Sequence, residues 1–179
     1  MATFLLTLSL VIMVGLTAIA TQFLRGHTPV EIPAYLITYS LILLPSITFL
    51  TGVSVALNVL LRDKYLTYAV SIATAAGLLY LYANGHNHWL YNPLLYQLWN
   101  YQDLTTGGIN HWLILIHRIY CISIAILSLS LVHLFFPRKS TRAASIIGHF
   151  RSSGWSLIGV IVSLAATIFT ALTIVWRVP

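Results

Sequence analysis

Histidine is the residue type in this chain that could bind a metal ion or a haem, and the chain has seven of them. Neutral imidazole is the commonest transition-metal ligand in proteins. Four histidines lie in or just after one polar stretch, residues 83–112: His86, His88, His111 and His117. His133 follows His117 by 16 positions, about 24 Å along a helix, so these two cannot share one ion or one haem. No spacing fixes a ligand set, and a structural or interfacial role is favoured over metal or haem binding.

Motifs for catalysis give little support for an enzyme. The chain has only three acidic residues, and it contains no GxSxG, HExxH or GxxxxGK[ST] pattern. No two carboxylates fall within one apolar segment, so paired acid–base chemistry has no candidates. We therefore predict no catalytic residue, no metal and no cofactor of its own for this chain.

The amino-acid composition indicates whether the chain folds in water or in a membrane. Hydrophobic residues make up 59% of the 179 positions and charged residues only 7%, too few to cover a surface that faces water. The apolar runs are continuous, whereas the strands of a membrane barrel alternate lipid-facing and lumen-facing residues. The predicted fold is an all-α integral membrane protein, with residues 1–179 forming a single membrane domain.

Five apolar windows approach the length of about 20 residues that a membrane-spanning helix needs. They are residues 1–24, 34–61, 65–82, 111–136 and 154–176. A cleavable signal peptide is the alternative for the first window, but no basic residue precedes it and several polar residues interrupt it. In the second window, Pro45 removes a backbone hydrogen bond and predicts a kink.

Basic residues sort the loops by side of the membrane. Arg62 and Lys64 follow the second window, and four more basic residues follow the fourth: Arg138, Lys139, Arg142 and Arg151. The positive-inside rule places these loops and the N-terminus in the cytoplasm and the C-terminus outside, in a membrane of the bacterial inner type. Anionic lipid headgroups are the expected partner of the net charge of +6, and nucleic acid is not.

The stretch 83–112, "ANGHNHWLYNPLLYQLWNYQDLTTGGINHW", falls outside by this sorting and is rich in aromatic rings, which favour the headgroup level. Leucines at 94, 95 and 98 share one helical face with Trp99, and Pro93 suits a first helical turn. We predict a short interfacial or re-entrant helix, ended by a turn at residues 105–108. The residues assigned to this external interfacial segment are Trp89, Pro93, Leu95, Trp99, Asp103 and Trp112.

His117 and Arg118 are polar residues inside the fourth window. Arg118 lies about 10 Å of helix from the outer end of that window, so it is expected to snorkel outward or to pair with Asp103. A transport or proton-relay role for this arginine is less favoured.

Several of these features together resemble a known family. In the run 35–82, an apolar helix with Pro45 leads into a basic turn and then into Tyr65 and Leu66. "HNHWLY" then opens an aromatic segment with Asp103 and Gly107–Gly108, and the next helix ends in the basic "FFPRK". This order resembles ABC-2-type transporter permeases, particularly bacterial permeases associated with M1-type aminopeptidase domains. The span after residue 142 is similar to the extra one that follows their core.

The resemblance covers most of the chain and corresponds to the C-terminal half of the family's membrane domain. It implies an exporter subunit that works with further permease spans and with a separate ATPase, which would bind the ATP. Arg62, Asp63 and Lys64 would then be cytoplasmic contacts, although the turn that engages the ATPase in the family is missing. The alternative is a non-catalytic accessory or scaffold subunit of a larger membrane complex, and a haem or metal redox membrane protein is less favoured.

Overall fold

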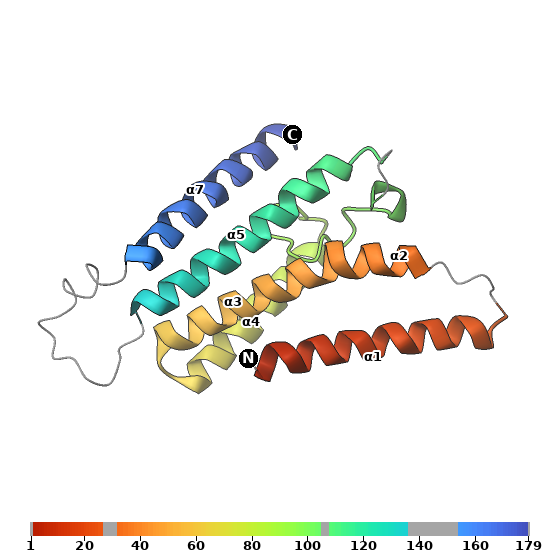
Figure 1. Ribbon diagram of the computed structural model, residues 1–179, viewed down its shortest axis with the longest axis horizontal. Helices are drawn as coiled ribbons and strands as arrows, with labels where there is room; N and C mark the ends of the chain where they lie inside the picture. Colours follow the sequence, from red (N-terminus) through yellow and green to blue (C-terminus); the bar gives the residue numbers. More distant parts are fainter. Residues whose placement is uncertain (1, 27–31, 105–107, 136–153, 179) are drawn as a thin grey trace, which may run out of the picture.

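The computed structural model describes residues 2–26, 32–104, 108–135 and 154–178, and every regular element in these ranges is helical. The long helices are α1 (Ala2–Leu24), α3 (Leu44–Leu61), α4 (Lys64–Ala83), α5 (His111–Phe135) and α7 (Gly154–Arg177) (Figure 1). The shorter elements are α2 (Ile32–Ile37), the π-helix η1 (Thr38–Leu43) and the 3₁₀ helix η2 (Tyr101–Leu104). The all-α prediction is confirmed.

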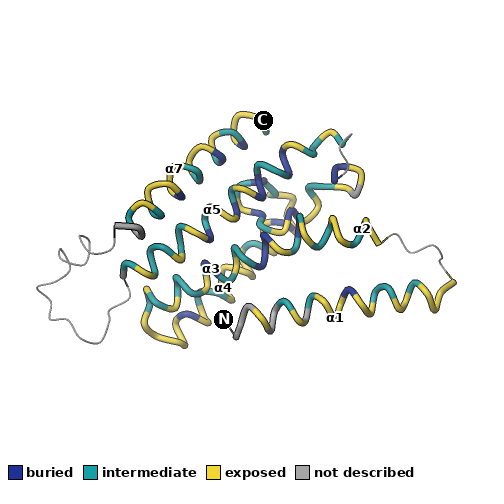
Figure 2. Tube along the Cα trace, in the orientation of Figure 1, coloured by how far each residue is buried: buried dark blue, intermediate teal, exposed yellow. Residues whose placement is uncertain are grey.

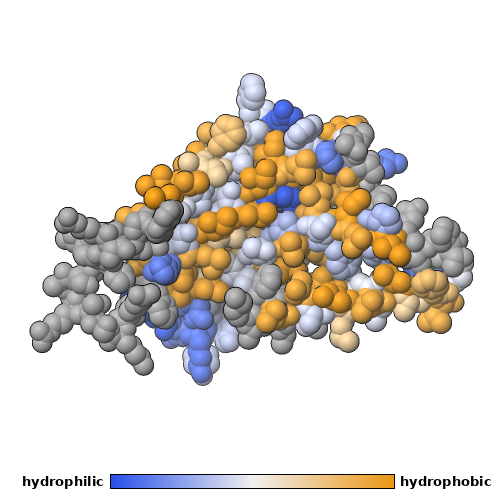
Figure 3. Space-filling view, in the orientation of Figure 1, coloured by the Kyte–Doolittle hydropathy of each residue, from blue (hydrophilic) through white to orange (hydrophobic). Residues whose placement is uncertain are grey.

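Each of the five predicted windows coincides with a helix. Within the described ranges, four helices are long and apolar enough to span a membrane: Ile32–Leu61, Lys64–Ala83, His111–Leu134 and Leu157–Arg177. Among the described residues, α1 contributes the apolar helical stretch Val11–Leu24. Apolar side chains cover most of the face in Figure 3, and hydrophilic ones gather near the turn between α3 and α4. These features are compatible with a membrane protein.

The predicted distortion near Pro45 takes the form of a π-helix. α2, η1 and α3 follow one another without a break over residues 32–61, and Pro45 lies in the first turn of α3. A proline has no N–H to donate, and a π-turn is one way for the preceding backbone to adapt. The Leu44 N–H accordingly donates to the Tyr39 carbonyl, five residues back. Figure 1 shows the helix changing direction between α2 and α3.

A two-residue turn reverses the chain between α3 and α4. Arg62 has a left-handed φ of 54° and ends α3, where its N–H donates to the Asn58 carbonyl at 3.1 Å. Asp63 then caps α4, and its Oδ1 accepts the N–H of Tyr65 at 2.7 Å and of Leu66 at 3.1 Å. Because both helix ends are satisfied locally, this turn brings α3 and α4 side by side.

α5 is the centre of the packed part and lies between α3 and α7 (Figure 1). Gly52 of α3 faces Ala125 of α5 so closely that a Cβ at Gly52 would lie 3.1 Å from the Ala125 Cα. Small residues at a membrane-helix contact let the backbones approach and gain dispersion energy. Figure 2 shows the buried residues concentrated around α3, α5 and the segment between α4 and α5, while α1 is exposed along most of its length.

The segment between α4 and α5, residues 84–110, differs from its prediction. Residues 93–99 form turns rather than a helix, and Leu95 and Gln97 have left-handed φ angles of 53° and 60° that no α-helix accommodates. The Asn92 side chain takes over the local bonding, because it accepts the Tyr96 N–H at 3.1 Å and donates to the Tyr96 carbonyl at 2.9 Å. The only helical turn among the described residues of this segment is η2. Of the predicted turn at 105–108, residues 105–107 lie outside the described ranges.

Candidate functional site

Arg118 is buried inside the helix bundle and joins three separate elements. It lies on α5, is only 3% exposed, and its Nη1 donates to the Ile42 carbonyl of η1 at 3.0 Å and to Ser46 Oγ of α3 at 2.9 Å. The same nitrogen lies 3.3 Å from the Pro93 carbonyl in the 84–110 segment. One nitrogen with two hydrogens shares them among three acceptors. We call these residues, together with His117, the Arg118 cluster.

His117 supplies the fourth acceptor. It is wholly buried, and its Nδ1 lies 3.0 Å from Arg118 Nη2. A guanidinium has only donors, so Nδ1 must accept, which assigns the ring hydrogen to Nε2 and makes the ring neutral. Trp89 meets the ring edge-on at 6.1 Å between centroids, and Cys121 Sγ lies 3.7 Å from Nδ1. The neutral ring keeps a second positive charge away from the buried guanidinium.

The Arg118 cluster contains a cation but no carboxylate. The four groups that accept hydrogen bonds from Arg118 are neutral, and its Nε has no hydrogen-bond partner among the described residues. The predicted pairing with Asp103 is wrong, and so is the prediction that the side chain snorkels outward. A buried charge is costly unless hydrogen bonds replace its hydration, and each bond to a charged group contributes about 1.5–3 kcal/mol. The carbonyls of Ile42 and Pro93 act here in place of a counter-ion.

A proline lies in or next to each of the two irregular stretches that supply carbonyl acceptors to the cluster. Ile42 is within the π-helix that precedes Pro45, and Ser46, one turn later on the same face, donates to the Ile42 carbonyl at 2.7 Å. Pro93 comes immediately before the turn in which Leu95 is left-handed. Backbone that leaves regular α-geometry presents carbonyls to side chains, and Arg118 binds one carbonyl from each irregular stretch. The cluster thereby fastens the 84–110 segment to the helices.

Apolar packing holds the same segment in place. Trp89, Leu95 and Leu104 are buried in a cluster completed by residues of η1, α5 and α7: Ile42, Leu113, Ile114 and Ile174. Of the residues that were predicted to be interfacial, Trp89 and Leu95 thus lie in the core, Trp99 packs half-buried against it, and Trp112 is 67% exposed. Much of the segment fills the end of the bundle instead of resting on it.

Asp103 organises the second half of the segment. Its carboxylate accepts the backbone N–H of Asn100 at 3.0 Å, the backbone N–H of Asn110 at 3.3 Å, and the Asn110 side-chain amide at 3.3 Å. These bonds, first of all that from Asn100, hold the pKa of Asp103 below its usual value, although burial acts in the other direction. A Cβ at Gly108 would collide with the Gln102 carbonyl and the Asp103 Cα, so this position requires glycine.

The histidines singled out for metal or haem binding do not converge. His86 is exposed, His88 Nδ1 accepts the Leu90 N–H at 3.2 Å, and His111 Nδ1 is buried without a hydrogen-bond partner among the described residues. In the part of the chain that the structure describes, no group of three His, Cys, Asp or Glu residues is placed to hold a metal ion. Only His117 joins a polar cluster, and there its ring accepts a hydrogen bond from Arg118.

Sequence reasoning identified His117 and Arg118 but missed Ser46 and the two carbonyls that bind the arginine. The signal that could have located them is the pair of prolines, since each marks backbone with an altered hydrogen-bond pattern. Arg62, Asp63 and Lys64, the predicted cytoplasmic contacts, are exposed in the turn between α3 and α4. The basic residues after the fourth window, Arg138, Lys139, Arg142 and Arg151, lie outside the described ranges.

Comparison with known proteins adds no relative to this description, because no family model, no curated protein and no solved structure matches the chain. The likeness to ABC-2 permeases therefore remains a prediction from the residues given above.

Proposed function

We propose that this chain is a non-catalytic membrane subunit that packs against helices of other subunits in a larger complex. The observation that carries the proposal is the isolation of α4. In its most apolar part only 11% of the residues are buried, against 39% in α5, and α4 packs mainly against α3. A helix with so little cover from its own chain offers a long surface to lipid or to another protein.

The side chains on α4 favour another protein over lipid. Ala69, Ala73 and Gly77 recur every fourth residue, are exposed, and share one face. At 3.6 residues per turn this face lies nearly opposite Thr67 and Tyr82, the buried residues of α4. A Cβ added at Gly77 would meet nothing within 4 Å. Small residues at this spacing typify contacts between membrane helices, where they let two backbones approach closely.

The topology that we propose follows the charges. In Figure 1, the turn between α3 and α4, the end of α5 and the start of α7 lie at one end of the molecule. Arg62 and Lys64 are exposed at that end, and Lys64 Nζ lies 5.0 Å from the centre of the Tyr65 ring. Contact with anionic headgroups would place this end in the cytoplasm and the 84–110 segment outside a bacterial-type inner membrane.

An exporter subunit of the ABC-2 type is the second candidate function. The α3–α4 turn favours it, because Asp63 is used to cap α4 while Arg62 and Lys64 are left exposed to a cytoplasmic partner. In that case a separate ATPase would supply the energy, and further permease spans would complete the pathway. Arg118 gives more support to the scaffold, since it is only 3% exposed and its hydrogen bonds join helices and the 84–110 segment instead of leaving a charge open to a substrate.

The experiment is gentle purification of the chain from its host, with mass spectrometry of everything that accompanies it. Ala73→Leu should release the partner subunits, whereas Ala75→Leu, which adds the same volume on a different exposed face of α4, should retain them. A Walker-motif ATPase among the partners would support the exporter function, and a stable complex without such an ATPase would support the scaffold function. A chain that purifies alone, or partners that are insensitive to Ala73→Leu, would contradict the proposal.

A further inference from the structure

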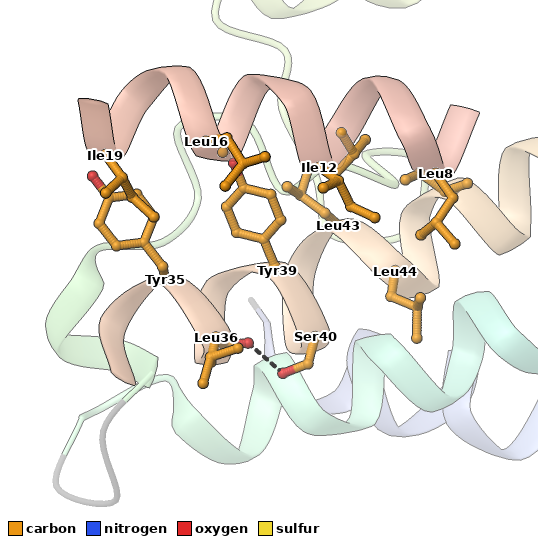
Figure 4. Close-up of a pocket in the computed structure, with 13 residues that line it drawn as sticks. Leu8, Ile12, Leu16, Ile19, Tyr35, Leu36, Tyr39, Ser40, Leu43 and Leu44 are labelled. Carbon is orange, nitrogen blue, oxygen red and sulfur yellow. Dashed lines mark hydrogen bonds between the residues drawn. The ribbon is translucent and has the colours of Figure 1, made fainter. Parts of the chain in front are cut away.

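An apolar groove lies beside α1, and no residue of α4 lines it. It has a volume of about 410 Å³ and runs between α1 and the continuous helix formed by α2, η1 and α3. Figure 4 shows Ile19 and Tyr35 at one end of the groove and Leu8 and Leu44 at the other. The few polar side chains in its lining include Ser40, whose hydroxyl donates a hydrogen bond to the Leu36 carbonyl at 2.7 Å. The groove thus offers almost nothing to a polar ligand.

The dimensions of the groove match a hydrocarbon chain. From Leu8 to Ile19 it follows eleven residues of α1, about 16 Å, which is close to half of the roughly 30 Å hydrocarbon core of a bilayer. The groove is therefore long enough to hold much of one acyl chain.

A cation stands beyond one end of the groove. Arg25 is exposed in the turn that ends α1, where its N–H donates to the Thr21 carbonyl at 3.1 Å. It follows Ile19 by six residues, about 9 Å along the helix axis. If α1 spans the membrane, Arg25, which follows the last residue of the helix, reaches the level of the headgroups, where phosphate is the complementary charge.

Glycine at position 15 keeps the groove in this shape. A Cβ there would lie 2.7 Å from the Tyr39 hydroxyl, so α1 and η1 touch at this point and the groove forms along the contact. We propose that the groove binds one acyl chain of a phospholipid whose phosphate lies at Arg25. This site is separate from α4 and from the partners proposed for it, so either proposal can fail without the other.

The test measures lipid binding to the full chain by native mass spectrometry, with collisional activation to remove loosely held lipid. The probes are dioleoyl phosphatidylglycerol and dioleoylglycerol, which have the same chains but differ in the phosphate. Ile12→Trp fills the groove, and Met13→Trp adds the same ring at the neighbouring exposed position, which does not line it. Arg25→Gln removes the cation, and Arg177→Gln removes an exposed cation at the end of α7.

We expect one retained phosphatidylglycerol per wild-type chain, lost in Ile12→Trp and kept in Met13→Trp. Arg25→Gln should lower phosphatidylglycerol binding about fivefold and leave dioleoylglycerol binding unchanged, while Arg177→Gln changes neither. Ser40→Leu, which narrows the groove from the other wall, repeats the test if Ile12→Trp fails to fold. Equal retention in the two tryptophan variants, equal effects of the two arginine variants, or loss of a co-purifying protein in place of lipid would each overturn the proposal.

Discussion

The packed part of this molecule and its two loosely attached helices are held by different means. α3, α5 and the 84–110 segment are joined by the buried Arg118 cluster and by the close contact between Gly52 and Ala125. α1 and α4 each pack mainly on the α2–η1–α3 helix and leave most of their side chains exposed. Lipid is as apolar as leucine, so apolar surface alone does not hold membrane helices together. Hydrogen bonds and close packing decide which parts of the chain form a core and which remain open to other molecules.

Removing Arg118 should have the largest effect, because it takes away the hydrogen bonds that hold the packed part together. We expect Arg118→Met to lower the free energy of unfolding in detergent by about 3–5 kcal/mol, because each buried acceptor left without a donor costs about 1–3 kcal/mol. Equilibrium denaturation measures the loss, and Arg177→Met, at an exposed site on α7, is the control. Arg118→Lys should recover only part of the stability, since one ammonium cannot reach all the acceptors. Equal stability of Arg118→Met and the control would show that the cluster is not needed.

A matched pair of glycines compares the two regions directly. Gly52→Val should destabilise the isolated chain by about 1–3 kcal/mol, because the new side chain meets the Ala125 backbone at just over 3 Å. Gly77→Val makes the same change on α4, where a Cβ meets nothing within 4 Å, and should leave the isolated chain unaffected. Thermal unfolding of both variants in the same detergent gives the answer. If the two glycines respond alike, the packing difference between α3 and α4 has no energetic meaning.

Acid should act on the 84–110 segment with a smaller effect. The pKa of Asp103 is lowered in the folded chain, so the carboxylate adds stability above its unfolded pKa of about 4, and this stability is lost as the pH falls through the lower folded value. The wild-type denaturation midpoint should therefore fall below about pH 4 relative to Asp103→Asn, while the difference between them stays constant from pH 5 to 7. A wild-type pH profile parallel to that of the variant would assign the acid sensitivity to other groups.

The smallest change in unfolding free energy is expected at His86, which does not pack against the core. His86 is exposed at the start of the segment, and His86→Ala should alter the unfolding free energy by less than about 0.5 kcal/mol. Trp99→Glu, at a half-buried ring that packs against the core, should cost clearly more. Denaturation of the two variants side by side tests whether the aromatic rings or the exposed histidine matter for this segment. A larger loss at His86 would restore the case for a ligand there.

Helices were predictable here and polar contacts were not. Continuous apolar runs fixed the helix ends to within a few residues: the predicted window 34–61 is the helix 32–61, and 65–82 is α4. Because Arg118 lies inside an apolar window, it was expected either to snorkel outward or to pair with Asp103. Two of its actual partners are backbone carbonyls, and because every residue has one, the residue types do not show which carbonyls will bind. The helix at 93–99 was inferred from four residues on one face, a pattern that the Asn92 side chain overrides with its own hydrogen bonds.

The length of the continuous helix over residues 32–61 sets how it would fit a bilayer. Its 30 residues measure about 45 Å, whereas the 20 residues of α4 measure about 30 Å, the thickness of a typical hydrocarbon core. The 32–61 helix ends and α4 begins at the same tight turn, so the surplus length lies at the α2 end. That end has to tilt, bend at η1, or stand above the hydrocarbon, and each response relieves hydrophobic mismatch. The angle between α2 and α4 should therefore follow the thickness of the bilayer in which the chain is placed.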